Sequence, residues 1–169
     1  GAHHINQAAV ANLAELTCIA QLIWLTGRND EAWVSAQVDT LADDLQARVR
    51  VYGYLEDDLP HALAAADVVV ARAGAATLGE FPALGLPAIL VPYPYAGMHQ
   101  ERNAHFLVES GAAIKVDDAA LKRELVAALE KLLGAPEQLK RMSDAMRGLA
   151  QPRAAANIAA LLQSLGTRA

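Results

Sequence analysis

Residues 67–103 read DVVVARAGAATLGEFPALGLPAILVPYPYAGMHQERN, and this stretch decides the fold of the 169-residue chain. The apolar, β-branched run 68–71 predicts a short strand that is buried on both faces of a parallel sheet. Small residues follow at 73–76, and from Thr77 onward apolar residues recur at helical spacing. The free N–H groups and partial positive charge of a helix start favour phosphate. The stretch therefore predicts an anion site at the end of a buried strand.

A second unit repeats this plan directly afterwards. The tripeptide Gly85-Leu86-Pro87 ends the helix, residues 88–91 predict another buried strand, and the proline-containing segment 92–97 predicts a rigid loop. A further helix is expected to open near His99. Loops that follow neighbouring parallel strands lie at the same edge of the sheet, which is where ligands bind in open α/β folds.

The rest of the chain continues the alternation of strands and helices. We expect strands at 19–25, 49–52 and 113–116, and helices from the start to about residue 16 and at 31–45, 57–66, 100–110, 119–133, 136–149 and 153–165. This pattern predicts an α/β, Rossmann-like three-layer domain with a parallel sheet. No strand precedes the first helix, although the strand order 3-2-1-4-5-6 places the first strand centrally. We therefore expect a gap beside the fourth strand, in a fragment or in a chain whose slot another segment fills.

Composition fits one domain and excludes several classes of protein. The hydrophobic fraction is 54%, and the net charge of -5 argues against a nucleic-acid partner, which needs a basic surface. Cys18 is the only cysteine, so neither an intrachain disulfide nor a cysteine zinc site is expected. No apolar run approaches 18 residues, which predicts a soluble chain. The histidines lack metal-binding spacing and there is no Asp-x-Asp pair, so we expect no metal and no cofactor.

Three motifs bring a resemblance to a known family. They are Arg-Ala-Gly-Ala-x-Thr-x-x-Glu at 72–80, Gly-Leu-Pro-Ala at 85–88 and His-Gln-x-x-Asn-Ala at 99–104. Residues 66–113 resemble the donor-binding half of the MurG-type glycosyltransferases, and weaker similarity extends over nearly the whole chain. These enzymes transfer N-acetylglucosamine from UDP-N-acetylglucosamine to the lipid-linked muramyl pentapeptide precursor of peptidoglycan.

The resemblance implies an architecture and partners. Residues 1–169 would be the UDP-sugar-binding domain of an inverting, metal-independent transferase with two Rossmann-like domains, the GT-B fold. Residues 152–169 would form a C-terminal helix that packs on an N-terminal acceptor domain outside this chain. That domain would supply the general base, the lipid-linked acceptor site and peripheral contact with the inner face of the cytoplasmic membrane. The resemblance thus places no catalytic residue in this chain, which alone should be inactive.

The predicted anion site has a functional and a structural interpretation. By resemblance, the backbone N–H groups of Ala75, Ala76 and Thr77 would bind the diphosphate of the donor after the turn at Gly74. A glycine here is equally expected where a turn needs a positive φ.

Two interpretations also apply to Glu80. Thr-x-x-Glu is the pattern of a capping box, in which Thr77 caps the helix and Glu80 reaches back to the cap. By resemblance, Glu80 would instead accept hydrogen bonds from the ribose hydroxyls. Arg72 would either offset the diphosphate charge or pair with Asp67 or Glu80.

Polar residues of the next helix complete the expected site. His99, Gln100 and Asn103 lie within one turn and are typical of a solvated helix start. The resemblance implies that Gln100 and Asn103 contact sugar hydroxyls and that His99 lies near the diphosphate or the sugar. Leu55 is either a core residue or, by resemblance, the position whose backbone holds uracil.

Missing motifs exclude three other classes of protein, and two alternative functions remain. The chain lacks the Gly-x-Gly-x-x-Gly pattern of dinucleotide oxidoreductases in the required context, a Walker loop, and the Gly-x-Ser-x-Gly elbow of hydrolases. Two alternatives stay open: a stand-alone donor-binding subunit of a split N-acetylglucosamine transferase, and a non-catalytic nucleotide-sugar binding module.

Overall fold

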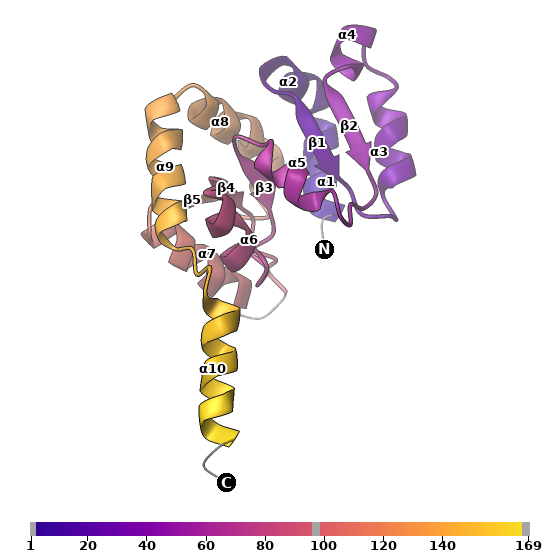
Figure 1. Cartoon of the computed structure of the whole chain (residues 1–169). Coiled ribbons are helices and arrows are strands. Elements are labelled where there is room, and N and C mark those ends of the chain that lie inside the picture. The colour runs from indigo at the N-terminus through magenta and orange to yellow at the C-terminus, as the bar shows by residue number, and fades with distance from the viewer. Residues whose placement is uncertain (1–2, 96–98, 167–169) are drawn as a thin grey trace.

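Helices and strands alternate along the chain in the computed structural model, which describes residues 3–95 and 99–166 (Figure 1). The strands are β1 (Leu22–Leu25), β2 (Val49–Tyr52), β3 (Val69–Ala71), β4 (Ala88–Leu90) and β5 (Ala113–Lys115). The helices are α1 (His3–Ala11), α2 (Leu13–Ile19), α3 (Glu31–Val38), α4 (Asp43–Gln46), α5 (Leu59–Ala64), α6 (Thr77–Leu84), α7 (His99–Glu109), α8 (Leu121–Leu133), α9 (Pro136–Gly148) and α10 (Ala154–Gly166). The predicted α/β class is confirmed.

The strands are all parallel but form two separate sheets. One sheet holds β1 and β2, with Leu22 opposite Val49, and the other has the order β3-β4-β5. These are the orders that remain when the first strand is taken from the sequence 3-2-1-4-5-6. The predicted gap is therefore present between β1 and β3, whose sheets lie apart in Figure 1.

Helices rather than strands connect the two sheets. A hydrophobic cluster runs from Leu16 and Trp24 on the β1 side to Val91 and Leu125 on the β5 side, because α1 packs directly on α8. A second cluster, which includes Phe81, packs α6, α7 and α9 around β4. Since each buried branched or aromatic side chain contributes about 1.5–3 kcal/mol, these clusters hold the helical layers on the sheets.

Some predicted boundaries are wrong where a polar side chain competes with the helical backbone. The first helix is divided at Asn12, whose Nδ2 donates to the carbonyls of Ala8 and Lys122, at 2.8 and 2.9 Å. The expected helix 31–45 ends at Val38 and resumes as α4, because Asp39 and Thr40 form a turn in which Thr40 Oγ1 donates to the Gln37 carbonyl at 2.7 Å. The predicted strand 19–25 begins only at Leu22, because α2 continues to Ile19.

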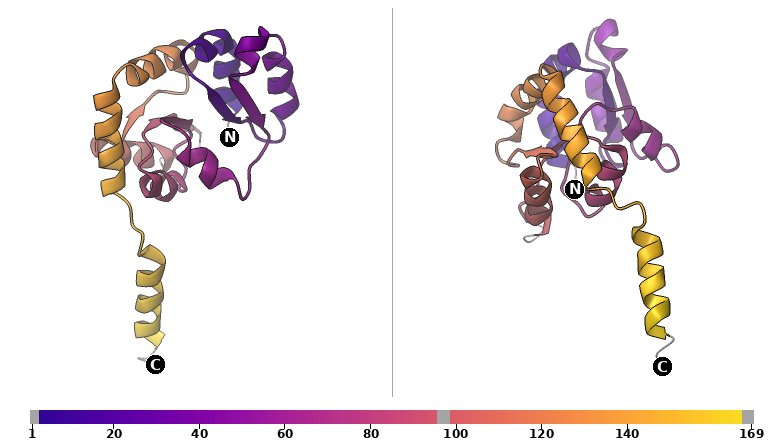
Figure 2. Two further views of the ribbon diagram at one scale, coloured as in Figure 1. Left: turned by 45° about the horizontal axis from the view of Figure 1, so that its top comes forward. Right: turned by 60° about the vertical axis from the view of Figure 1, so that its left-hand side comes forward.

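The helix α10 extends away from the rest of the molecule in all views (Figures 1 and 2). Every described residue in it is exposed, and its large apolar side chains, Ile158, Leu161, Leu162 and Leu165, are 57–64% exposed. The predicted helix is present. Its contact with an acceptor domain stays a prediction.

Candidate functional site

The loops after β3 and β4 meet at the carboxyl edge of the sheet, as the sequence predicts. The helix α7 fastens both loops: Asn103 Nδ2 donates to the Ala73 carbonyl at 2.9 Å, and Gln100 Oε1 accepts from the backbone N–H of Tyr93 at 2.9 Å. These bonds fix the direction of each amide. Gln100 keeps its NH₂ group as a donor, and Asn103 keeps its carbonyl oxygen as an acceptor. The pair thus offers one donor and one acceptor, a combination that can pair with hydroxyl groups. His99 is exposed at the start of α7.

The start of α6 keeps free backbone donors. The N–H of Thr77 donates to the Gly74 carbonyl at 3.2 Å, whereas those of Ala75 and Ala76 have no acceptor among the described residues. Gly74 has no positive φ, and an added Cβ would meet no described atom within 4 Å. The interpretation of Gly74 as a residue that allows a turn with positive φ is therefore wrong. The open space beside Gly74 and the free N–H groups of the exposed residues Ala75 and Ala76 leave room for an anion.

The capping-box interpretation is also wrong. The cap residue of α6 is Ala76, which makes no side-chain capping bond, and Thr77 is the first helical residue. The hydroxyl of Thr77 is buried and donates to the Gly74 carbonyl at 2.6 Å, so it shapes the turn instead of capping the helix. The carboxylate of Glu80 is exposed and makes no hydrogen bond or ion pair with the described residues. It is available to accept hydrogen bonds from a ligand.

Arg72 pairs with neither Asp67 nor Glu80. Its guanidinium lies 2.5 Å from Asp118, which follows β5, and donates to the Val91 carbonyl at 3.1 Å. Both side chains are nearly buried, at 12% and 11% exposure. Burial alone would raise the pKa of Asp118, but hydrogen bonds from His4 and Arg72 and the charge of Arg72 outweigh it and lower the pKa. The positive charge of Arg72 is thus largely compensated within the fold.

A buried polar network fastens α1 to the end of β1. Asn6 is 1% exposed, and its Nδ2 donates to the Thr26 carbonyl at 2.8 Å and to Asp30 at 2.7 Å. Its Oδ1 accepts from Trp24 Nε1 at 3.0 Å. The hydrogen bond from Asn6, followed by that from His3, lowers the pKa of Asp30. The sequence pattern gave no sign of this network because its members are far apart in the chain.

A pocket of about 430 Å³ lies at the carboxyl ends of β1 and β2, next to Leu55. Its lining includes Arg28 and Tyr54, and the guanidinium of Arg28 lies 5.5 Å from the centre of the Tyr54 ring. Leu55 is half-buried and belongs to neither hydrophobic cluster, so the core interpretation is wrong. Sequence reasoning missed Arg28 and Tyr54 as site residues, although both lie in the loops after strand ends, where ligand contacts in this fold are expected.

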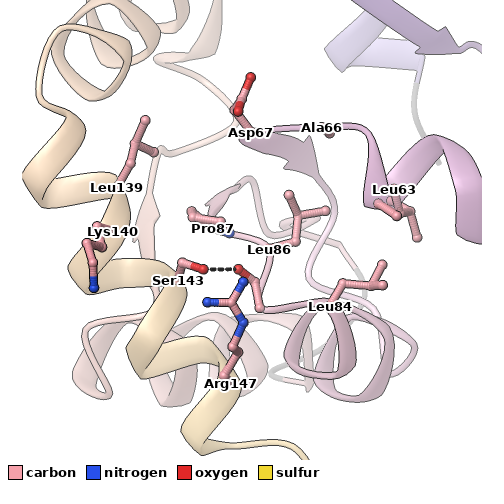
Figure 3. A pocket seen from close by; sticks show the side chains of 12 residues that line it. Leu63, Ala66, Asp67, Leu84, Leu86, Pro87, Leu139, Lys140, Ser143 and Arg147 are labelled. Atoms are coloured by element: carbon pink, nitrogen blue, oxygen red, sulfur yellow. Dashed lines mark hydrogen bonds between the residues drawn. The ribbon is translucent and has the colours of Figure 1, made fainter.

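Another pocket, of about 290 Å³, lies at the opposite edge of the sheet, where Asp67 and Pro87 precede β3 and β4 (Figure 3). Arg147 and Ser143 of α9 reach across it, and Ser143 Oγ donates to the Gly85 carbonyl at 2.7 Å. Ligands in open α/β sheets bind outside the carboxyl ends of the strands. We therefore interpret this pocket as part of the packing between α6 and α9.

Residues 3–95 and 99–166 contain neither a cluster of potential metal ligands nor a helix that could span a membrane. No group of three or more His, Cys, Asp or Glu side chains there could hold a metal ion. No helix in that part of the chain is long and apolar enough to span a bilayer.

Known proteins are similar to this chain in sequence and in fold. Residues 1–159 match the glycosyltransferase family 28 C-terminal domain. The UDP-N-acetylglucosamine–N-acetylmuramyl-(pentapeptide) pyrophosphoryl-undecaprenol N-acetylglucosamine transferase of Roseiflexus sp. is 42% identical over 99% of this chain and 42% of its own length. The enzyme of the same name from Chlorobaculum parvum is 40% identical over 98% of this chain and 44% of its own length.

Solved structures of glycosyltransferases are also similar to this chain. The crystal structure of MurG from Acinetobacter baumannii has a TM-score of 0.82 at 29% identity, over 97% of this chain and 47% of that one. The glycotransferase of kitacinnamycin, with a TM-score of 0.64 at 22% identity, shares the fold. The chain spans less than half the length of the curated relatives it matches. It belongs to glycosyltransferase family 28, as a C-terminal domain of that family.

Proposed function

We propose that this chain is the donor-binding domain of an inverting glycosyltransferase and that it binds UDP-N-acetylglucosamine. One observation carries the proposal: the free N–H groups of Ala75 and Ala76, just before α6, lie close in the chain to the unpaired carboxylate of Glu80 in its first turn. Free backbone N–H groups at a helix start bind a diphosphate, and a carboxylate accepts hydrogen bonds from ribose hydroxyls. The names of the Roseiflexus and Chlorobaculum relatives support the choice of donor.

The donor would lie along the carboxyl edge of both sheets. The uracil would contact the backbone at Leu55, beside the pocket of Arg28 and Tyr54. The diphosphate would meet the start of α6, including Thr77, after the turn at Gly74. The NH₂ of Gln100 and the carbonyl oxygen of Asn103 would bind neighbouring sugar hydroxyls, with His99 near the diphosphate or the sugar. A donor and an acceptor held in fixed directions distinguish sugar epimers, because the wrong epimer leaves one of them unpaired.

The reaction would be a direct displacement at the anomeric carbon. An acceptor hydroxyl forms the new glycosidic bond while the bond to the diphosphate breaks, and the electron pair leaves with UDP. The helix start of α6 stabilises the charge that develops on the leaving group. The general base is assigned to an acceptor domain outside this chain.

The acceptor side of the proposal rests on the relatives. By their names, the acceptor would be the lipid-linked muramyl pentapeptide, so the complete enzyme would work on the inner face of the cytoplasmic membrane. In that enzyme the exposed apolar side chains of residues 152–166 would pack on the acceptor domain. The same surface would serve a separate acceptor subunit, which is the second candidate architecture.

Calorimetric titration with UDP, UDP-N-acetylglucosamine, UDP-glucose and GDP tests donor binding. We expect binding of the uridine ligands but not of GDP. Glu80→Ala removes charge-assisted hydrogen bonds worth about 1.5–3 kcal/mol and should weaken UDP binding by about 10- to 100-fold. Since Glu80 has no partner within the described structure, the stability of the variant should stay within about 0.5 kcal/mol of the parent.

The matched control is Glu137→Ala, which removes an exposed glutamate from the first turn of α9. This variant should bind UDP like the parent. Unchanged UDP affinity in Glu80→Ala, with the parent binding normally, would exclude the ribose contact. A folded parent that binds none of the ligands would contradict the donor-binding function of this chain.

A further inference from the structure

We propose that Tyr95 contacts the sugar of the donor and that its aromatic ring stacks on the C–H groups of one face of the pyranose. The contact rests on the proposed donor function and adds to it a residue that recognises the apolar face of the sugar. Three observations carry it: the exposure of the Tyr95 ring, its position after β4, and the contacts that hold it there.

The side chain of Tyr95 is unusually exposed for an aromatic residue. It is 80% exposed, more than any other large apolar side chain among the described residues. Covering such a ring removes a large apolar area from water, which stabilises the complex with whatever covers it. A single exposed apolar side chain can occur anywhere on a protein surface, so the position of this one decides its interpretation.

Tyr95 lies at the edge of the sheet that carries the candidate site. It belongs to the segment that follows β4, and two residues earlier the backbone N–H of Tyr93 donates to Gln100 Oε1 at 2.9 Å. The NH₂ group of the same Gln100 is the donor that we propose for a sugar hydroxyl. The segment with Tyr95 is therefore fastened to a residue of the proposed sugar site.

Neighbouring side chains hold the Tyr95 ring in place. It makes an edge-on contact with the half-buried Tyr93, with 5.6 Å between the ring centres and 72° between the planes. The guanidinium of Arg72 lies 5.2 Å from the centre of the Tyr93 ring. The prolines on both sides of Tyr93 restrict the backbone that carries the two rings. A ring that is held in advance loses little conformational entropy when a ligand covers it.

An aromatic ring and a pyranose are chemically complementary. The face of the ring is negative and attracts the weakly positive C–H groups of the sugar. A pyranose of the gluco configuration carries its hydroxyls around its rim and axial C–H groups on its two faces. Gln100 and Asn103 would bind hydroxyls at the rim while Tyr95 covers a face. UDP has no pyranose, so its binding should not depend on Tyr95.

Calorimetric titration of Tyr95→Ala and Tyr95→Phe with UDP, UDP-N-acetylglucosamine and UDP-glucose tests the contact. Tyr95→Ala should weaken the binding of both UDP-sugars by about 3- to 10-fold, because the ring contact is lost. Its affinity for UDP should stay within about twofold of the parent, because the nucleotide does not meet the ring. Tyr95→Phe keeps the ring and should bind all three ligands like the parent.

The matched control is Leu161→Ala, which removes an exposed apolar side chain from α10 and should leave all three affinities unchanged. Equal weakening of UDP and the UDP-sugars in Tyr95→Ala, with the variant folded by circular dichroism, would overturn the proposal, because Tyr95 would then shape the site without contacting the sugar. Unchanged UDP-sugar affinity in Tyr95→Ala, or a loss in Tyr95→Phe as large as in Tyr95→Ala, would overturn it as well. In each of these cases the parent binds UDP and the donor function stands. A folded parent that binds none of the ligands would contradict the donor function and, with it, the contact.

Discussion

Replacing Asn6 by alanine should destabilise the fold strongly, because this one side chain satisfies three partners. The change leaves the Trp24 indole N–H and the Thr26 carbonyl without partners, and both residues are buried, at 8% and 3% exposure. Each buried polar group that loses its partner costs about 1–3 kcal/mol. We therefore expect the free energy of unfolding to fall by about 2–5 kcal/mol, a large part of the usual total of about 5–15 kcal/mol.

Part of that loss should depend on pH, because Asn6 also donates to Asp30. The hydrogen bonds from Asn6 and His3 lower the pKa of Asp30 in the folded state. A carboxyl whose folded pKa is lowered stabilises the fold above its unfolded pKa of about 3.9, and this contribution is lost as the pH falls through the folded pKa. The difference between parent and Asn6→Ala should narrow at pH 3 without vanishing, since Trp24 and Thr26 do not titrate.

Urea unfolding at pH 7 and pH 3 measures both effects. Asn12→Ala is the control, because it removes the same side-chain atoms. One of the two carbonyls that accept from Asn12, that of Lys122, lies in exposed surroundings, so water can replace the lost amide there. We expect this control to lose less than about 1 kcal/mol. If Asn6→Ala lost no more than Asn12→Ala at pH 7, the argument from unsatisfied buried groups would be refuted.

Three further changes test the electrostatics, the turn geometry and the interior of α6. Asp118→Asn should cost about 2 kcal/mol at pH 7, since it removes the charge that faces Arg72. The lowered folded pKa of Asp118 means that this cost is present above about pH 4 and shrinks as the pH falls to 3, so equal unfolding curves at pH 7 would contradict it. Gly85→Ala should cost about 2 kcal/mol or more, because Gly85 has a φ of 64° and a Cβ there would lie 2.6 Å from Arg147 Nε. Gly79 lies inside α6 with open space around it, so Gly79→Ala should instead raise the free energy of unfolding by about 0.5–1 kcal/mol. If thermal unfolding showed Gly85→Ala to be more stable than Gly79→Ala, this account of the two glycines would be excluded.

The sequence predicted the fold well because each element carries a local signal. The apolar run at 68–71 and the helical spacing from Thr77 to Leu84 are visible within ten residues, and α6 has the predicted bounds. The broken helix after Val38 was missed because the hydroxyl of Thr40 competes with the helical backbone without interrupting the apolar spacing.

The candidate site was predictable in its location and less so in its contacts. Gly74 follows a predicted strand and Glu80 lies near the start of the predicted helix after it. The alternation of strands and helices therefore places both residues at the carboxyl edge of the sheet. The partner of Arg72 could not be predicted, because Asp118 lies 46 residues further along the chain and meets it only through the order of the strands. Local reasoning assigned Thr77 a capping role because the motif fits, but its hydroxyl bonds the turn before the helix.

The division of the sheet would give the proposed donor a mechanical role. The pocket by Tyr54, where we propose that uracil binds, lies at the sheet of β1 and β2, and the helix start after Gly74 lies at the sheet of β3, β4 and β5. Helix packing joins the two sheets, with no continuous backbone ladder between them in the described part of the chain. A ligand that contacts the ends of both sheets would restrain their relative motion, and part of its binding free energy would be used for this restraint. If the donor binds as proposed, its affinity and the rigidity of the domain would be coupled. A substitution that weakens the packing of α1 on α8 should therefore lower the affinity for the ligand, although the substituted residue does not contact the ligand.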